Sequence, residues 1–514
     1  MIIVLKPSCT WTPLRNIATG KNGIPNVSLS LKPNVNEFQT SSLIRYPTGT
    51  FHYSCNMKMK FIFASFIILF QASTYSQPTY SPTGKNRMAA EWEPALGVII
   101  TWPLSIPYKL VIALAEENKL YIMITGEDVQ KEAIIWLSKW HIDPKKVKFI
   151  RAPQGIDAFW VRDWGPHAVF TQDGTMKLAD GKYIYATPAT GFKCDDPLQF
   201  IYMTPDKQII KTEIDDKAPS FIGLSMDIDM IELPFAFTGG NVISDGLGDA
   251  FSTCILKNEN QYGGEPAEKL ITDAESLLGI ENYHFISNFE AEGIQHIDCF
   301  MKMLDEERLL VMRPPSDHPL YNVYEDIVNN ELSKLKDAYG HPYKILRLDT
   351  DRYLRDELAA YSNSLILNKT IYVPLFGIKQ DSVALSQWAD AMPGYKIEGF
   401  EYQINKEPTV SDEARRHYGS RGWNGGDALH CRTRAMWDPQ MLYMSVDQIQ
   451  DDVKPNVDYP VFVIIKAYSK MPLIDESLKL SWREKGSDHW NEISLIHGNI
   501  TDQFVANIPG AKPG

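Results

Sequence analysis

The sequence has 514 residues, of which 44% are hydrophobic and 22% are charged, and its formal net charge is -13. This length allows a large buried core, either in one domain with additional segments or in two to four smaller domains. The negative charge argues against nucleic-acid binding, because non-specific binding to phosphates depends on clustered Lys and Arg. An acidic surface suits cationic substrates, but it is also an ordinary way to keep a protein soluble.

The first 76 residues fall into two segments. Residues 1–56 are polar and lack sustained periodicity, so we expect an N-terminal extension outside the fold. Residues 57–76 are typical of a signal peptide, because lysines precede the apolar run Phe61–Phe70 and small residues follow it. Met57 is then an alternative start, and we expect a secreted protein, either extracellular or periplasmic. The apolar run is too short for a membrane span of roughly 20 residues, and a buried strand or helix is the other interpretation.

From about Arg87 to Pro439, short apolar strands alternate with amphipathic helices. The first predicted strands are 96–102, 120–124 and 147–150, and the helices between them are 108–118 and 127–140. The predicted helix and strand pairs that follow are 266–278 with 283–286, 323–338 with 344–348, and 382–392 with 395–400. A doubly wound parallel sheet would also give this α/β pattern. No glycine-rich phosphate loop follows an early strand, so the sequence does not support nucleotide binding.

Beyond residue 441 the pattern changes to strands without helices. The predicted strands are 459–468, 477–483, 490–496 and 503–508, separated by Pro, Gly, Asp and Asn turns. They are typical of a β-sandwich. An immunoglobulin-like sandwich needs about 100 residues and only about 70 remain, so we expect residues 441–514 to form an incomplete immunoglobulin-like domain.

The first segment whose side chains could form a functional site is Trp160-Val161-Arg162-Asp163-Trp164-Gly165-Pro166. The Trp160 ring and the Asp163 carboxylate together could hold a planar cation, through the indole face and a bidentate ion pair. The alternative is a structural pair of Arg162 and Asp163 packed under the Gly-Pro turn.

Three further segments carry polar residues at turns or strands. In His296-Ile297-Asp298, alternation along a strand would place the imidazole and the carboxylate on one face. The segments Gly239–Gly246 and Asn363–Ser364 are turn-forming sequences beside predicted strands. Taken alone, the His-x-Asp triplet is most often a surface pair, and the two turns are most often ordinary turn chemistry.

Four cysteines follow the expected signal peptide: Cys194, Cys254, Cys299 and Cys431. None forms a CxxC pair, so we expect no zinc site, although an exported protein could pair two of them in a disulfide. Cys431 follows Gly425-Gly426 and precedes Arg432, and a nearby positive charge would favour its thiolate. A buried cysteine that acts as a small hydrophobe is the alternative. The adjacent His430 is less suited to be its base, because neighbouring side chains in an extended segment point in opposite directions.

These five segments, in this order, resemble the guanidino-group-modifying (pentein) superfamily, over residues 87–440. Within it they resemble the branch of agmatine deiminases and Porphyromonas-type peptidylarginine deiminases. The stretches that carry the resemblance are WxRDxGP (160–166), GGNxxxDG (239–246), HID (296–298), NSLILN (363–368) and GGxxLHCRT (425–433). The resemblance implies a pseudo-fivefold α/β-propeller, with no organic cofactor and no metal.

The same resemblance implies a role for each site residue. Cys431 is the expected nucleophile, His296 moves protons, and Asp163 and Asp298 hold the substrate nitrogens. Asn363 is expected to bind the substrate or orient the nucleophile, and Trp160 is expected to line the channel for the alkyl chain. These roles suit a guanidinium, which carboxylates can orient while a thiolate attacks and a histidine handles protons.

The expected function is secreted protein-arginine deimination, which gives citrulline and ammonia through a covalent thiouronium intermediate. Export and the trailing sandwich favour it over an agmatine or free-arginine deiminase. However, no arginine lies between Arg162 and Arg308, where the Porphyromonas-type enzymes have an arginine pair for the C-terminal carboxylate of the substrate. The expected partner is therefore either an arginine-containing peptide or a small guanidino substrate. A catalytically silent extracellular binding protein is the alternative from another class.

Overall fold

The computed structural model describes residues 2–5, 85–156, 158–184, 188–189, 191–196, 199–200, 213–262, 266–291, 293–419, 421–447, 456–484, 487 and 489–510. The expected signal peptide at 57–76 lies outside these residues, as does most of the extension at 1–56. No helix within the described ranges combines the length and the apolar character needed to cross a membrane.

Five mixed sheets form most of the described structure between residues 87 and 437, and each has both parallel and antiparallel pairs. One sheet has the order β22-β3-β4-β5, with strands at Arg434–Trp437, Ala95–Thr101, Lys119–Ile124 and Val147–Arg151. A second has the order β10-β7-β6-β2, with strands at Met230–Ala236, Met176–Lys182, His167–Phe170 and Arg87–Met88. Strand β22, near the end of this region, thus pairs with β3, near its beginning.

The other three sheets have three strands each. They are β11-β12-β13 (Ile243–Ser244, Asp249–Thr253, Asn282–Ile286), β14-β15-β16 (Met301–Met303, Arg308–Arg313, Lys344–Asp349) and β19-β20-β21 (Leu365–Leu367, Thr370–Leu375, Lys396–Glu401). In each, the first two strands are antiparallel and the last two are parallel. Two small two-stranded sheets pair β8 (Pro188–Ala189) with β9 (Gln199–Phe200) and β17 (Arg352–Leu354) with β18 (Glu357–Leu358).

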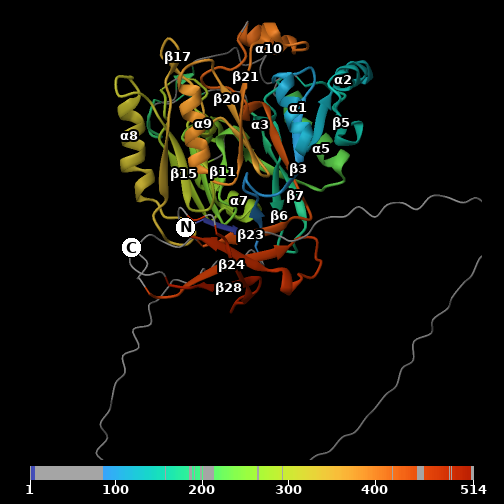
Figure 1. Cartoon of the computed structure of the whole chain (residues 1–514). Coiled ribbons are helices and arrows are strands. Elements are labelled where there is room, and N and C mark those ends of the chain that lie inside the picture. Colours follow the sequence, from blue (N-terminus) through green and yellow to red (C-terminus); the bar gives the residue numbers. More distant parts are fainter. Residues whose placement is uncertain are drawn as a thin grey trace, which may run out of the picture. The chain divides into compact units, whose positions relative to one another are not determined.

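Helices accompany these sheets, and Figure 1 shows α8 and α2 on opposite sides of the strands. The helices are α1 (Tyr108–Glu117), α2 (Glu127–Lys139), α3 (Val161–Trp164), α5 (Ala218–Met226), α6 (Ile255–Tyr262), α7 (Ala267–Leu278), α8 (Tyr321–Asn330), α9 (Gln380–Ala391) and α10 (Asp412–Tyr418). Helix α7 illustrates why they form: Leu270, Ala274 and Leu278 recur every fourth residue and are buried on one face. Gly279 then ends the helix with a φ of 75°, a conformation that glycine adopts easily.

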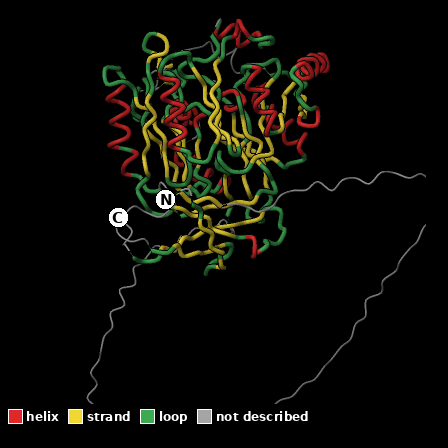
Figure 2. The backbone as a smooth tube through the Cα atoms, in the orientation of Figure 1, coloured by secondary structure: helices red, strands yellow, loops and turns green. Residues whose placement is uncertain are grey.

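The helices and strands predicted from periodicity are confirmed in type and order, with two exceptions. The predicted strand 490–496 is divided into β26 (Asn491–Ser494) and β27 (Ile496–His497), which belong to different sheets. The predicted helix 323–338 ends earlier, because α8 stops at Asn330 and the short 3-10 helix Leu332–Lys334 follows. Leu332 is fully buried there, so the apolar pattern continues although the α-helix does not. Figure 2 shows the strands in the interior of the α/β region and the helices along its sides.

The C-terminal residues form two antiparallel sheets, which confirms the change to strands beyond residue 441. The first sheet has the order β23-β24-β28-β27, with strands at Leu442–Val446, Tyr459–Ala467, Gln503–Ile508 and Ile496–His497. The second pairs β25 (Lys479–Arg483) with β26 (Asn491–Ser494), and β1 (Ile2–Leu5) lies at its edge. One apolar cluster includes Val463 and Phe504 from the first sheet and Leu480 from the second. We call these two sheets the C-terminal β unit.

A buried arginine joins the α/β region to the C-terminal β unit. The guanidinium of Arg87 lies 4.1 Å from the ring centroid of Tyr443, and its Nε donates to the hydroxyl of Tyr468 at 3.1 Å. Glu93 pairs with the same guanidinium, so its charge is compensated inside the protein.

The four cysteines among the described residues fall into two groups. Cys194 and Cys254 form a disulfide across 60 residues, while Cys299 and Cys431 are buried free thiols. Cys431 is therefore a free thiol, which a nucleophile requires, and it is also buried, as the alternative of a small hydrophobe predicts.

Candidate active site

Cys431 lies in a tight turn that Asn363 holds in place. The turn is the 3-10 helix η6 (His430–Arg432), directly before β22. The side-chain oxygen of Asn363 accepts hydrogen bonds from the backbone N–H groups of Ala428, His430 and Cys431, at 3.2, 2.9 and 3.3 Å. The side-chain Nδ2 of Asn363 donates to the Cys431 sulfur at 3.2 Å. Asn363 thus fixes both the backbone and the thiol of the expected nucleophile.

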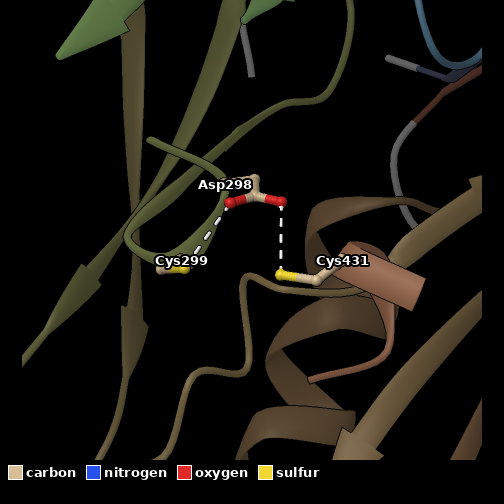
Figure 3. Close-up of side chains that lie close together, drawn as sticks. All are labelled: Asp298, Cys299 and Cys431. Carbon is tan, nitrogen blue, oxygen red and sulfur yellow. Dashed lines mark hydrogen bonds between the residues drawn. The ribbon is translucent and has the colours of Figure 1, made fainter. Parts of the chain in front are cut away.

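Asp298 reaches the same thiol from a different turn. It lies in the 3-10 helix η3 (Ile297–Cys299), and its Oδ2 is 3.8 Å from the sulfur of Cys431 (Figure 3). The same oxygen is 2.6 Å from Nδ1 of His430. Asp298 is fully buried, so this carboxylate is directed into the site rather than into solvent.

Asp163 and His296 form the next part of the site, around Gly240. Oδ1 of Asp163 lies 3.5 Å from Nδ1 of His296 and accepts the backbone N–H of Gly240 at 3.2 Å. A Cβ atom at Gly240 would lie 2.9 Å from His296 Nδ1 and 3.4 Å from Asp298 Oδ2, and it would collide with Asp163. The three expected site residues therefore surround a position where any side chain would crowd them.

Trp160 is connected to the site through Asp427. Its indole Nε1 donates to Oδ2 of Asp427 at 2.7 Å, and Asp427 belongs to the turn that precedes Cys431. The ring packs against Phe159 with 4.7 Å between ring centroids and is nearly buried. The structure thus places all six sequence-predicted residues on interacting turns, with Trp160 linked indirectly.

Two local expectations were wrong. His296 and Asp298 do not share a strand face, because residues 297–299 form a 3-10 helix; the two side chains still meet at Gly240. His430 does not point away from the site, because residues 430–432 are also a 3-10 helix rather than an extended segment. Its two ring nitrogens contact Asp298 and Glu91, so it connects two carboxylates.

A charged group behind Asp298 was not predicted from the sequence. Oε2 of Glu91 lies 2.7 Å from Nε2 of His430 and 3.2 Å from Nζ of the buried Lys302. Arg162 approaches the same carboxylate at 4.0 Å. Glu91 lies in an ordinary turn near the start of the α/β region, so only the fold reveals that it orients His430 and, through it, Asp298.

A sequence profile of the Porphyromonas-type peptidyl-arginine deiminase family matches residues 87–404. The chain belongs to this family. The matched range includes Asp163, His296, Asp298 and Asn363, and the Cys431 turn lies beyond it.

Individual relatives agree with this assignment. A protein of Mycoplasma mycoides subsp. mycoides SC named "putative agmatine deiminase" is 26% identical over 273 residues, which cover 47% of this chain and 69% of that protein. The agmatine deiminase of C. jejuni has a TM-score of 0.50 at 15% identity, over 70% of this chain and 99% of its own. That of Enterococcus faecalis also has a TM-score of 0.50, at 19% identity, over 69% and 96% of the two chains. The two structures show a shared α/β fold. As a member of this deiminase family, the chain is a hydrolase that acts on carbon–nitrogen bonds of amidines.

In this deiminase, the carboxylates determine the charge of His296. Burial opposes a charged imidazole, but the carboxylates of Asp163, Asp298 and Glu259 outweigh it and raise the pKa of His296 to about 9. Burial also raises the pKa of Asp163, and the positive charge of His296 partly offsets that effect. At neutral pH the imidazolium is therefore available as a proton donor.

The thiol of Cys431, in contrast to His296, is held in its neutral form. A hydrogen bond with Cys299 lowers its pKa, but burial and nearby carboxylates, Asp298 first among them, outweigh this bond and raise the pKa to about 12. Burial would raise the pKa of Asp298 too, but its hydrogen bond with His430 contributes to lowering it instead. A protonated thiol thus lies beside an anionic carboxylate. A bound cation would reverse this balance, because positive charge favours the thiolate.

Proposed function

We propose that this deiminase is a secreted protein-arginine deiminase, which converts the guanidinium of arginine residues to a ureido group and releases ammonia. The observation that carries the proposal is the contact of the buried Cys431 thiol with Asn363 and Asp298, beside Asp163 and His296. A nucleophile, two carboxylates and a proton donor together meet the needs of a cationic electrophile that loses an amine.

In the proposed reaction, Asp163 and Asp298 each accept N–H groups of the guanidinium. The thiol proton passes to solvent as the substrate cation binds, because the added positive charge offsets the carboxylates that disfavour the thiolate. The thiolate then forms a bond with the guanidinium carbon, and His296 gives its proton to the nitrogen that departs as ammonia. This step leaves a covalent thiouronium on Cys431.

The second half of the proposed reaction regenerates the thiol. His296, now neutral, takes a proton from water as the oxygen attacks the thiouronium carbon. The carbon–sulfur bond then breaks, the proton of the new hydroxyl group passes to the departing sulfur, and the product leaves as citrulline. Asn363 holds the Cys431 sulfur in position during both halves of the reaction, because its side chain forms hydrogen bonds with the sulfur and with the turn that contains Cys431.

The wider architecture is part of the proposal. We propose that the five mixed sheets are the blades of a pseudo-fivefold α/β-propeller, supported by the pairing of β22 with β3, which links the two ends of the region. We propose that the C-terminal β unit belongs to an immunoglobulin-like domain, and that residues 57–76 are a cleaved signal peptide. N-terminal sequencing of exported protein tests the last point, since a start before residue 57 would contradict it.

The substrate of this deimination is either a small guanidino compound such as agmatine or an arginine residue of a peptide. The names of the relatives favour agmatine, whereas the family name and the predicted export favour peptidyl arginine. The absence of arginine from residues 163–307 supports a site that does not clamp a C-terminal carboxylate.

A matched substrate panel tests the proposal. Ammonia release and ureido product are measured for agmatine, free arginine and two peptides, one with internal and one with C-terminal arginine. We expect the peptides to have the higher kcat/KM. A preference for agmatine would assign the small-molecule deiminase instead. Turnover of none of these substrates would support a silent binding protein.

A further inference from the structure

The second free thiol, Cys299, has no part in the proposed reaction, yet it lies beside the nucleophile. The Sγ atoms of Cys299 and Cys431 and one carboxylate oxygen of Asp298 all lie within 4.8 Å of one another. Figure 3 shows the Asp298 carboxylate directed at both sulfurs, which come from turns far apart in the sequence. The other two cysteines described by the structure are joined in a disulfide, so these are its two available thiols.

We propose that Cys299, Cys431 and Asp298 form a binding site for a thiophilic divalent cation, with Zn²⁺ as the ion that fits best. In a tetrahedral zinc site, bonds of about 2.3 Å to sulfur and about 2.0 Å to oxygen imply sulfur–oxygen separations of roughly 3.5 Å. Oδ1 of Asp298 is 3.5 Å from the Cys299 sulfur, and Oδ2 is 3.8 Å from the Cys431 sulfur. Each sulfur therefore lies at about the distance that a shared small cation requires from one oxygen of the Asp298 carboxylate.

The surroundings hold each donor in place. Asn363 donates to both sulfurs, at 3.9 Å for Cys299 and 3.2 Å for Cys431. His430 bonds Asp298 from behind at 2.6 Å. Such outer contacts orient ligands and raise metal affinity.

The charge of the site also suits a cation. Thiols are ordinarily protonated at neutral pH, so binding releases two protons to solvent as two metal–sulfur bonds form. The negative charges of the two thiolates and Asp298 then exceed the two positive charges of the ion. The carboxylates of this site already favour a cationic group. Two thiolates select Zn²⁺ over Mg²⁺ or Ca²⁺, which prefer oxygen ligands. Water can complete the fourth position.

A bound ion would make Cys431 a ligand instead of a nucleophile. Zn²⁺ is therefore expected to inhibit the deiminase reversibly, and only this consequence depends on the proposed function. The ion is not a cofactor of the reaction. The expectation of no zinc site came from the lack of a CxxC pair, a local pattern that cannot detect two cysteines brought together by the fold.

Cobalt substitution tests the site without any substrate. Reduced full-length protein is titrated with Co²⁺ under anaerobic conditions, and the thiolate-to-cobalt charge-transfer band is followed, with Zn²⁺ as the competing ion. We expect one Co²⁺ per chain. In Cys299→Ser and Cys431→Ser we expect the affinity to fall at least about a hundredfold, more than the loss of an outer-shell partner would cost. His341→Asn is the matched control, because His341 with Glu307 and Asp337 forms the other group of possible ligands in the described structure. This variant is expected to keep the band.

Thiol mapping provides a second measurement on the unmodified protein, in case a variant fails to fold. Iodoacetamide labelling followed by peptide mass spectrometry is expected to show Cys299 and Cys431 protected together by Zn²⁺, with protection reversed by a chelator. Absence of the charge-transfer band, or protection of only one of the two cysteines, would overturn the proposal. Deimination by chelated protein is assayed separately, so an inactive protein that binds Co²⁺ would contradict the proposed function and not this site.

Discussion

The catalytic turns and the C-terminal β unit are stabilised by opposite kinds of interaction. Around Cys431 the buried side chains are charged, including Arg162, Asp163, Asp298 and Arg432. In the C-terminal β unit they are mainly apolar, and they join its two sheets. Buried charges need partners and contribute little net stability, whereas buried apolar area contributes directly. The comparison indicates that the catalytic groups and much of the stabilising apolar core lie in different parts of this chain. Variants should therefore change either the activity or the free energy of unfolding, but not both.

Cys431→Ser should give the largest effect, because a hydroxyl has no accessible anionic form at neutral pH. We expect kcat to fall at least about 10⁴-fold, which corresponds to roughly 5 kcal/mol in the activation barrier. The melting temperature should stay close to that of the wild type, since serine is nearly isosteric. Activity near the wild-type level would exclude Cys431 as the nucleophile.

Asp163→Asn and Asp298→Asn should each lower kcat/KM by about a hundredfold or more, or roughly 3 kcal/mol, because each removes one charged partner from a buried cation. The readout is the steady-state rate with an arginine peptide. Asp128→Asn is the matched control, since the side chain of Asp128 on α2 is 97% exposed. If both site variants match this control, other groups hold the guanidinium.

Leu480→Ala tests the contribution of the C-terminal β unit to stability. Leu480 is fully buried in the C-terminal β unit, so its truncation should lower the free energy of unfolding by about 3 kcal/mol. The kcat at a temperature where the variant stays folded should remain within about twofold of the wild type, a difference of less than 0.5 kcal/mol. Ile496→Ala is the control, because Ile496 is 64% exposed in the same unit. A large fall in kcat would mean that the two regions are coupled.

His296 links charge at the site to stability. Its pKa of about 9 in the folded protein exceeds the unfolded value of about 6.5. The stabilisation is therefore complete below about pH 6.5 and is lost as pH rises through about 9, by up to about 3 kcal/mol. Urea unfolding at several pH values should show this loss in the wild type, and His296→Asn should not show it. Equal pH dependence in both proteins would contradict the raised pKa.

Amidating the C-terminus of an arginine-ending peptide should give the smallest effect. Without an arginine between residues 163 and 307, the carboxylate lacks a guanidinium clamp, and the ammonium group of Lys193 is already paired with Asp326 and Glu331. We expect kcat/KM to change by less than about tenfold, or roughly 1.4 kcal/mol, between peptides that differ only at that terminus. A loss of a hundredfold or more would show that another group binds the carboxylate.

The sequence alone determined the order of helices and strands and most of the site residues. Apolar periodicity is a local property, so it predicted elements such as α7 and β4 and the change to strands after residue 441. The five polar segments, taken in order, indicated the family and named Asp163, His296, Asp298, Asn363 and Cys431. Local pattern failed where a turn replaced a strand, as at residues 297–299 and 430–432.

Only the tertiary structure decided which side chains meet. Glu91 contacts His430, although the two residues lie near opposite ends of the α/β region in the sequence. Cys299 lies beside Cys431, although the two belong to different turns. The Asn363 side chain holds the Cys431 turn from a third segment. Such contacts join residues that are far apart in the sequence and have no period or spacing of their own. They exist because buried polar groups must find partners once the sheets have brought these turns together.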